Sequence, residues 1–334
     1  MDYKSWMKNK MGLQSITERL NELEEKMLSQ QKEIKELTRK CRRQELERIR
    51  LERKVRYYYY KGLKPEEWEG ALAEWYQIRT GEELDYENPQ NFNQKIQWIK
   101  MRGITPEMQL LVDKYRVRPW VKEKIGEQYL IPLIGVWERA EEIDFDQLPN
   151  QFVLKANHGC KWNIIVRDKR KLDVEDTRKK LKDWLSIDYA FFNGMEMQYH
   201  EMKPCIIAET YMENDNQELH DYKVYCFSGK PTYIQFMTDR KKKLRGAFFD
   251  TDWIQQPFNN RESVEEKITR PENLQELLNL SEKLSEGFPF ARVDFYRLND
   301  GSWKFGEMTF TPASGLSKWK PAEYNKILGD KIQL

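Results

Sequence analysis

The chain has 334 residues, of which 34% are charged, yet its formal net charge is only +2. This length allows one large domain or two ordinary ones, and the near-neutral charge disfavours a uniformly basic nucleic-acid-binding protein. Three histidines and four cysteines without metal-ligand spacing disfavour a zinc site, and no apolar run approaches the ~20 residues of a membrane span, so we expect a cytoplasmic protein.

Residues 13–41 repeat apolar side chains in alternating steps of three and four, which is the heptad pattern of a coiled coil. The seam consists of Leu13, Ile16, Leu20, Leu23, Met27, Gln30, Ile34, Leu37 and Cys41. We expect residues 1–56 to form an oligomerisation helix that joins copies of this chain through residues 13–41. The alternative is a single helix that lies on the protein's own core.

Beyond Cys41 the seam degrades, and we expect the helix to continue as a basic arm to Arg56. The tyrosine run Tyr57–Tyr60 follows this arm. Aromatic side chains beside arginines can contact an anionic membrane or polysaccharide, but such tyrosines more often dock a long helix onto the next domain. We favour docking, and keep peripheral contact with membrane-associated polysaccharide machinery as the alternative.

Helical patterns at residues 66–81, at 88–103 and from Thr105 onward make residues 57–130 a helical lead-in. A short buried strand is expected at residues 129–137, interrupted by Pro132. These elements precede the stretches of the chain that carry candidate site residues.

Residues 151–166 have the pattern of two apolar strands around a polar loop, with Lys155 at the end of the first strand. A lysine there can offer a point charge to phosphate oxygens, and loop N–H groups can cradle a phosphate. Taken alone, a lysine at a strand end is usually only solvated. An amphipathic helix at 174–185 follows, and then a buried strand at 205–212 that carries Glu209 near its end.

A hairpin is predicted at residues 221–236, with Asp221 and Lys223 on one face. The dense basic run from Thr238 to Arg245 includes Arg240. We interpret this run as a solvated loop or as a cationic loop over an anionic substrate. An amphipathic helix at 273–284 comes next.

The stretch 290–315 predicts a second hairpin, because two strand patterns flank the turn residues 299–301. Asp294 and Glu307 lie at comparable distances from this turn, so they could face one another on adjacent strands. Two adjacent carboxylates repel unless a divalent cation lies between them, so this pair is a candidate metal site. The alternative is a surface hairpin with a solvated polar face.

Eight stretches in this order resemble the TupA-like branch of the ATP-grasp ligases, over residues about 88 to 330. They are NPQNFNQKIQWIK, LVDKYRVRPWVKEKIG, FVLKANHG, NIIVRDK, IIAETYM, DYKVYCFSGKP, GFPFARVDFY and FGEMTFTPASGLSKWKP. The resemblance implies an α+β fold in which two lobes, about 131–208 and 209–334, clasp a nucleotide. The helical coiled coil and the lead-in would precede this domain.

The resemblance also implies roles for individual residues. Lys155 would contact the nucleotide phosphates, and Glu209 would lie at the hinge beside adenine and ribose. The loop at 157–163 would cover the triphosphate of ATP through Asn157, His158, Gly159, Lys161 and Asn163. Asp221 and Lys223 would lie on the nucleotide side, and Mg²⁺ would be held by Asp294, Glu307 and Thr309. Arg292 would lie near the transferring phosphate or the substrate carboxylate, and Lys223 and Arg240 complete the catalytic set, with Arg240 on an anionic sugar.

The implied reaction is ATP-dependent activation of a carboxylate as an acylphosphate, which an amine then converts to an amide. The resemblance suggests that an amino acid is coupled to a sugar carboxylate during cell-surface polysaccharide biosynthesis. Two features depart from the pattern: Thr309 stands where many ATP-grasp enzymes have Asn, and Lys161 and Trp162 make the phosphate loop bulky. A degenerate, non-catalytic scaffold is therefore the main alternative. A glycosyltransferase is a third, since Asp250 and Asp252 match the letters of a DxD motif.

Overall fold

The computed structural model describes residues 3–214, 219–238, 244–264 and 266–334. The chain forms two compact units, Met1–Arg56 and Tyr57–Leu334. Arg240, predicted to hold an anionic sugar, lies outside the described residues. Within the described ranges, no helix is both long and apolar enough to cross a bilayer.

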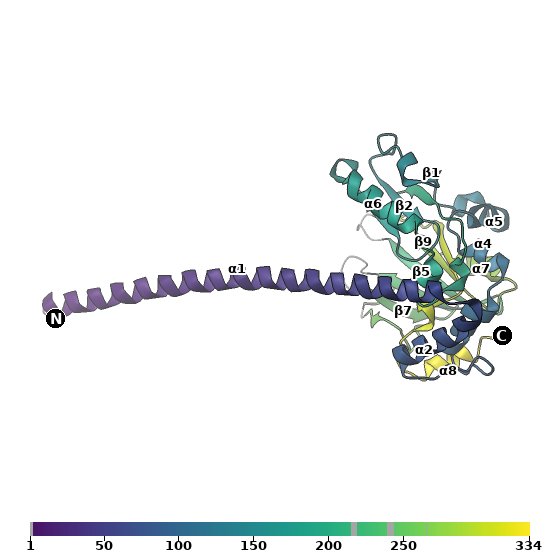
Figure 1. Ribbon diagram of the computed structural model, residues 1–334, viewed down its shortest axis with the longest axis horizontal. Helices are drawn as coiled ribbons and strands as arrows, with labels where there is room; N and C mark the ends of the chain where they lie inside the picture. Colours follow the sequence, from purple (N-terminus) through teal and green to yellow (C-terminus); the bar gives the residue numbers. More distant parts are fainter. Residues whose placement is uncertain (1–2, 215–218, 239–243, 265) are drawn as a thin grey trace. The chain divides into compact units, whose positions relative to one another are not determined.

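The predicted N-terminal helix is one uninterrupted element, α1 Tyr3–Gly62, and most of it makes up the first unit (Figure 1). The apolar seam residues whose side chains are described are more than half exposed, from Leu37 at 52% to Ile34 at 62%. Leu51 and Val55 continue the same register beyond Arg48 and are also exposed. The predicted helix is present but continues to Gly62, beyond the expected end at Arg56, and its association with a second copy stays a prediction.

The second unit contains the remaining helices and all of the strands. Its α-helices are α2 Trp68–Thr80, α3 Phe92–Trp98, α4 Pro106–Val112, α5 Val117–Lys124, α6 Val174–Leu185, α7 Leu274–Ser285 and α8 Tyr324–Gly329. Side-chain caps begin several of them: Asn91 accepts from the Gln94 amide before α3, and Thr105 accepts from the Met108 amide before α4. The helix α3 continues into a π-helical turn, Ile99–Gly103.

The smaller sheet has four antiparallel strands in the order β1-β4-β2-β3. Their bounds are β1 Leu133–Trp137, β2 Phe152–Ala156, β3 Asn163–Val166 and β4 Ile206–Thr210. The central strand β4 is buried, as predicted. The predicted buried strand at 129–137 is only partly buried, because β1 lies at the edge of the sheet.

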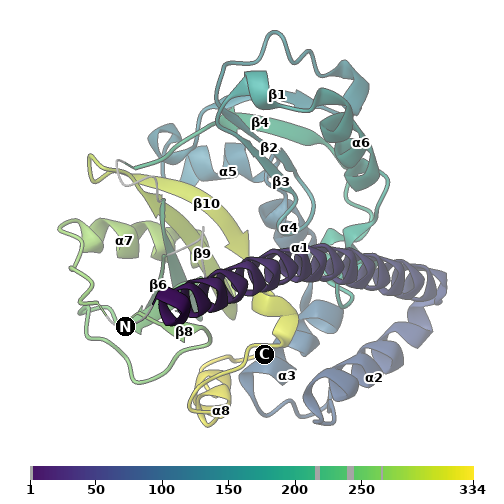
Figure 2. The same ribbon diagram turned by 90° about the vertical axis from the view of Figure 1, so that its left-hand side faces the viewer.

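The larger sheet has six strands in the order β10-β9-β5-β6-β7-β8, and Figure 2 shows it as a layer apart from the smaller sheet. Its strands are β5 His220–Phe227, β6 Lys230–Thr238, β7 Arg245–Phe249, β8 Glu262–Ser263, β9 Phe290–Arg297 and β10 Trp303–Thr309. Both predicted hairpins are present. The strands β7 and β8 were not predicted, because each is short and the first begins inside the basic run.

One apolar core joins the lead-in helices to the larger sheet. Phe92 of α3 is fully buried and meets both Phe290 of β9 and Trp319 edge-on, with ring centroids 5.3 and 5.4 Å apart. The residues Leu111, Val117 and others of α4 and α5 belong to the same core. The segment between α4 and α5 is thereby held beside the polar faces of both sheets.

Candidate functional site

The hairpin of β9 and β10 places the two predicted metal carboxylates opposite one another. Glu307 is the direct partner of Asp294, and Thr309 is the partner of Arg292. A register shift at Gly306 makes this pairing, and a Cβ there would lie 3.0 Å from the carbonyl oxygen of Asp294, so glycine suits this position. Alternate residues of a strand share a face, so all four side chains point to the same side of the sheet.

The neighbouring strand β5 adds a third polar row to this face. Lys223 is the direct partner of Asp294, so that Lys223, Asp294 and Glu307 lie side by side across three strands. The ammonium of Lys223 donates to Asp221 at 2.8 Å and also pairs with Asp294. Burial acts to lower the pKa of Lys223, but the carboxylates of Asp221 and Asp294 outweigh it and raise that pKa.

Arg292 lies between the two carboxylates. Its guanidinium donates to both oxygens of Asp294, at 2.7 and 2.8 Å, and also to Glu307 Oε1 at 3.2 Å and Thr309 Oγ1 at 3.1 Å. Burial raises the pKa of Asp294, while Arg292 and Lys223 oppose that rise. The repulsion expected between Asp294 and Glu307 is thus relieved by an arginine in this structure.

A second polar group lies on the smaller sheet. Lys155 Nζ is 2.6 Å from Glu209 Oε2, and Arg118 Nη1 is 3.0 Å from the other oxygen, Glu209 Oε1. Burial acts to lower the pKa of Lys155, but Glu209 outweighs it and raises that pKa, with further contributions from Tyr296 and Glu307 of the larger sheet. The ammonium of Lys155 therefore experiences charges from both sheets.

Two buried side chains fix the start of the loop between β2 and β3. The side chains of Asn157 and His158 are about 1% exposed, and Asn157 donates to Asp113 Oδ2 at 2.8 Å and accepts from the Cys205 amide at 2.7 Å. His158 contacts Asn157 Oδ1 and the carbonyl oxygen of Trp184. In this structure these two predicted nucleotide-binding side chains hold the loop to its surroundings.

The rest of the loop, residues 159–163, is partly exposed to solvent. Gly159 has a φ of +110°, and a Cβ there would lie 2.5 Å from the ring of Tyr189, so only glycine fits. Lys161 and Asn163 are exposed, whereas Trp162 is 9% exposed and stacks on Trp184 beneath the loop. The Trp162 side chain therefore does not occupy the solvent-exposed side of the loop, where it was expected to hinder the approach of a phosphate.

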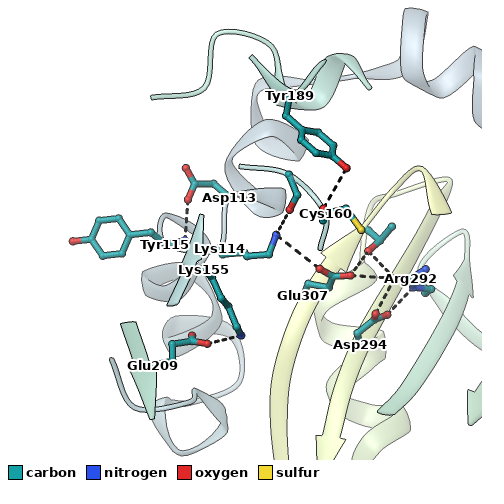
Figure 3. Close-up of polar contacts among 12 residues, drawn as sticks. Asp113, Lys114, Tyr115, Lys155, Cys160, Tyr189, Glu209, Arg292, Asp294 and Glu307 are labelled. Carbon is teal, nitrogen blue, oxygen red and sulfur yellow. Dashed lines mark hydrogen bonds and ion pairs between the residues drawn. The ribbon is translucent and has the colours of Figure 1, made fainter. Parts of the chain in front are cut away.

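Sequence reasoning assigned no role to Lys114 or Arg118. In the structure Lys114 lies beside Glu307 of the hairpin, and Arg118 lies beside Glu209 of the smaller sheet. Lys114 Nζ lies 2.6 Å from the carbonyl oxygen of Gly159 and 4.0 Å from Glu307 Oε2, so it connects the loop to the hairpin. Figure 3 shows Lys114 and Arg292 on opposite sides of the Glu307 carboxylate. Burial acts to raise the pKa of Glu307, but Lys114 and Arg292 outweigh it and lower that pKa.

A signal for these residues exists in the stretch LVDKYRVR. An acid, Asp113, is followed by three bases at alternate positions, Lys114, Arg116 and Arg118, between apolar residues. The Asp113 carboxylate accepts from the amides of Tyr115 and Arg116, at 2.8 and 2.9 Å, and so fixes the turn before α5. This turn carries Lys114 to its place between the loop and the hairpin.

The donor set of the hairpin suits a hard cation. Asp294, Glu307 and Thr309 offer carboxylate and hydroxyl oxygens from one face, and protein sites for Mg²⁺ often supply only one or two carboxylates beside substrate phosphates. Among the described residues, no three or more His, Cys, Asp or Glu side chains gather as a metal cluster. A cation at Glu307 and Thr309 requires Arg292 to leave them.

Comparison with known proteins places the chain in a family. A family model described as TupA-like ATPgrasp matches residues 94–333, and a search of curated proteins finds no match. Similar solved structures include N5-carboxyaminoimidazole synthetase from Staphylococcus aureus with ADP, D-alanine–D-alanine ligase from Bacillus anthracis with ATP, and L-amino acid ligase from Bacillus licheniformis. Their sequence identities are 16%, 17% and 12%, and their TM-scores are 0.40, 0.39 and 0.44.

These alignments cover 68%, 67% and 72% of this chain, but only 53%, 65% and 55% of the three solved chains. The chain thus spans less than two thirds of the length of each. The predicted α+β fold of the ATP-grasp type, with a long N-terminal helix, is confirmed. Because the family model covers more than half of the sequence, the chain belongs to the TupA-like ATP-grasp family.

Proposed function

We propose that this protein is an ATP-dependent ligase that joins an amine to a carboxylate through an acylphosphate. The observation that carries the proposal is the position of Lys114, whose ammonium contacts both the loop after β2 and the Glu307 carboxylate. Phosphate oxygens placed there would meet Lys114, Lys155 and the outward side of the loop. Such clustered cations suit phosphoryl transfer, which needs positioning and charge stabilisation rather than a covalent protein nucleophile.

Each residue of the site has a separate role in this proposal. Lys155 and Lys114 bind phosphate oxygens of ATP, and Glu209 accepts hydrogen bonds from the ribose once Lys155 turns to the phosphates. Asp294, Glu307 and Thr309 would hold Mg²⁺, which would neutralise charge on the phosphates. Arg292, released from Glu307, binds the transferring phosphoryl group or the substrate carboxylate. Lys223 keeps Asp294 ionised.

The reaction then balances in two steps. A substrate carboxylate oxygen attacks the γ-phosphorus, the bond to the β,γ-bridging oxygen breaks, and ADP leaves. The amine attacks the acyl carbon, the bond from that carbon to the phosphate oxygen breaks, and inorganic phosphate leaves with loss of the amine proton to solvent. The products are an amide, ADP and phosphate.

For the substrates, we propose a sugar carboxylate and an amino acid, in the synthesis of a cell-surface polysaccharide. The support is the family membership together with the basic run that includes Arg240, which can attract an anionic sugar. We place this activity in the cytoplasm, at the inner face of the membrane where such polysaccharides are assembled.

One observation favours a second candidate, a non-catalytic scaffold. Arg292 already donates hydrogen bonds to Asp294, Glu307 and Thr309. Its positive charge therefore offsets the repulsion between the two carboxylates of the hairpin without a metal. A scaffold of this kind would bind a glycan or a glycosyltransferase and would have no use for Mg-ATP.

Nucleotide binding separates the two candidates. Calorimetric titration with ATP, with and without Mg²⁺, should show Mg²⁺-dependent binding to the wild type and to Glu282→Gln, an exposed control on α7. Glu307→Gln should keep its fold but lose most of the Mg²⁺ dependence, because one anionic ligand is removed. Absence of ATP binding by the wild type supports the scaffold and contradicts the ligase. Mg²⁺-dependent ATP binding that is unchanged in Glu307→Gln contradicts the assignment of Glu307 to Mg²⁺.

A further inference from the structure

The helix α1 changes its charge along its length. Residues 18–38 contain four basic and six acidic side chains, whereas residues 39–56 contain nine basic and three acidic ones, a net charge of +6. The whole chain has a net charge of only +2, so the second segment is the more basic part of a nearly neutral protein. A segment of this kind indicates an anionic partner.

The basic side chains are concentrated on one side of the helix. At 3.6 residues per turn, five arginines fall within an arc of about 100° on the side opposite the apolar seam, and no acidic residue shares this arc. We name this surface the arginine face; it consists of Arg39, Arg42, Arg43, Arg50 and Arg53. The three acids of the segment, Glu45, Glu47 and Glu52, lie on its flanks or toward the seam.

The arginine face is exposed and has no acidic partners in the described part of α1. All five arginines are exposed, and none of them makes an ion pair there. Arg48, on the seam side, contrasts with them because it pairs with both Glu45 and Glu52 at 2.6 Å. The charge of the seam side is thus compensated within the helix, and that of the arginine face is not.

We propose that the arginine face binds the surface of an anionic phospholipid bilayer. Clusters of four to eight basic residues on an amphipathic helix are typical of binding to anionic lipid headgroups. Leu46 lies in the middle of this face and is 60% exposed, which suits the boundary between headgroups and acyl chains. The long arginine side chains can extend around it to the phosphates.

A lipid surface fits better than a nucleic acid or a soluble glycan. From Arg39 to Arg53 the helix is uninterrupted and spans roughly 21 Å, so its charges are spread along a length that an extended surface can contact. The arginine face contains no aromatic side chain on which a base could stack. Because the seam lies on the opposite side, a second copy bound along the seam leaves the arginine face accessible.

Binding of the full-length protein to vesicles tests this proposal. Vesicles of phosphatidylcholine with 30% phosphatidylglycerol should bind the protein at low salt, and pure phosphatidylcholine vesicles should not. The variant R42Q/R43Q/R50Q/R53Q should bind about 600-fold more weakly, since each basic residue near an anionic surface contributes roughly fivefold. The control R19Q/K26Q/K32Q/K35Q removes the same charge from the mixed segment and should bind within about threefold of the wild type.

Three outcomes would overturn the proposal. Equal losses in the two quadruple variants would mean that only net charge matters. Binding to pure phosphatidylcholine would mean that the apolar seam inserts instead. Binding to a soluble polyanion such as heparin or single-stranded DNA, with none to the anionic vesicles, would assign the surface to another kind of partner. Circular dichroism verifies that each variant retains its helix, and the test does not depend on ligase activity.

Discussion

The ion-pair group on the smaller sheet allows a quantitative test of how the site is held. Among the residues that the structure describes, Glu209 forms an ion pair with both Lys155, at 2.6 Å, and Arg118, at 3.0 Å. The three side chains are 8%, 17% and 14% exposed, so water screens them little. Replacing Glu209 by Gln therefore removes the ion-pair partner of two nearly buried cations.

Breaking such a buried group by removing one partner costs 3–5 kcal/mol in general, and the glutamine oxygen still accepts one hydrogen bond. We therefore expect Glu209→Gln to lower the free energy of unfolding by about 3 kcal/mol, or roughly 5 °C in Tm. Lys155→Met in the same protein should recover part of this loss, because it removes one of the two uncompensated cations. The interaction energy of the pair should be at least about 1 kcal/mol.

Thermal denaturation of the wild type, both single variants and the double variant measures this cycle. The exposed control Glu282→Gln should change the stability by less than about 0.5 kcal/mol. If Glu209→Gln is as stable as this control, or if the effects of the two substitutions simply add, the ion-pair group does not stabilise the sheet and the reasoning is wrong.

Three further predictions concern other parts of the chain. In a parallel, in-register pair of α1 helices Cys41 faces its own copy, so a copper–phenanthroline oxidant should link the chains through a disulfide; a monomer in sedimentation, or a link that persists in Cys41→Ser, would contradict this. Lys114→Ala should weaken ATP binding at least tenfold while changing Tm little, as titration would show; unchanged affinity would remove Lys114 from the phosphate site. Burial lowers the pKa of Lys100 to about 7, so the unfolded chain binds more protons above that pH, and the stability of the wild type relative to Lys100→Met should rise from pH 7 to pH 9. A difference that stays constant with pH would place the titration elsewhere.

The sequence predicts the hairpin of the site well because the signals are local. The alternation around Asp294, the turn residues before Gly301 and the strand that carries Glu307 specify one antiparallel pair, and the structure has that pairing. The bulge at Gly306 sets the final register, and no periodic pattern shows it. Local patterns thus give the faces of strands, and single residues adjust them.

Contacts between distant segments were not predictable in the same way. Lys114 reaches Gly159 and Glu307 only because the lead-in helices share a core with the larger sheet. The position of Arg292 between two carboxylates also depends on the pairing of two strands. Periodicity identifies which side of an element is buried, but it carries no information on which distant charges will meet there.

The most direct test of carboxylate activation follows an oxygen atom from the substrate carboxylate into inorganic phosphate. A panel of uronic acids labelled with ¹⁸O in the carboxyl group is incubated with ATP, Mg²⁺ and a mixture of amino acids, and both products are examined by mass spectrometry. The proposal predicts one ¹⁸O in the inorganic phosphate and a sugar product heavier by one amino acid minus water, neither of which should form with Glu307→Gln. Formation of ADP with unlabelled phosphate, or no product from any acid in the panel while Mg-ATP still binds, would contradict carboxylate activation by this protein.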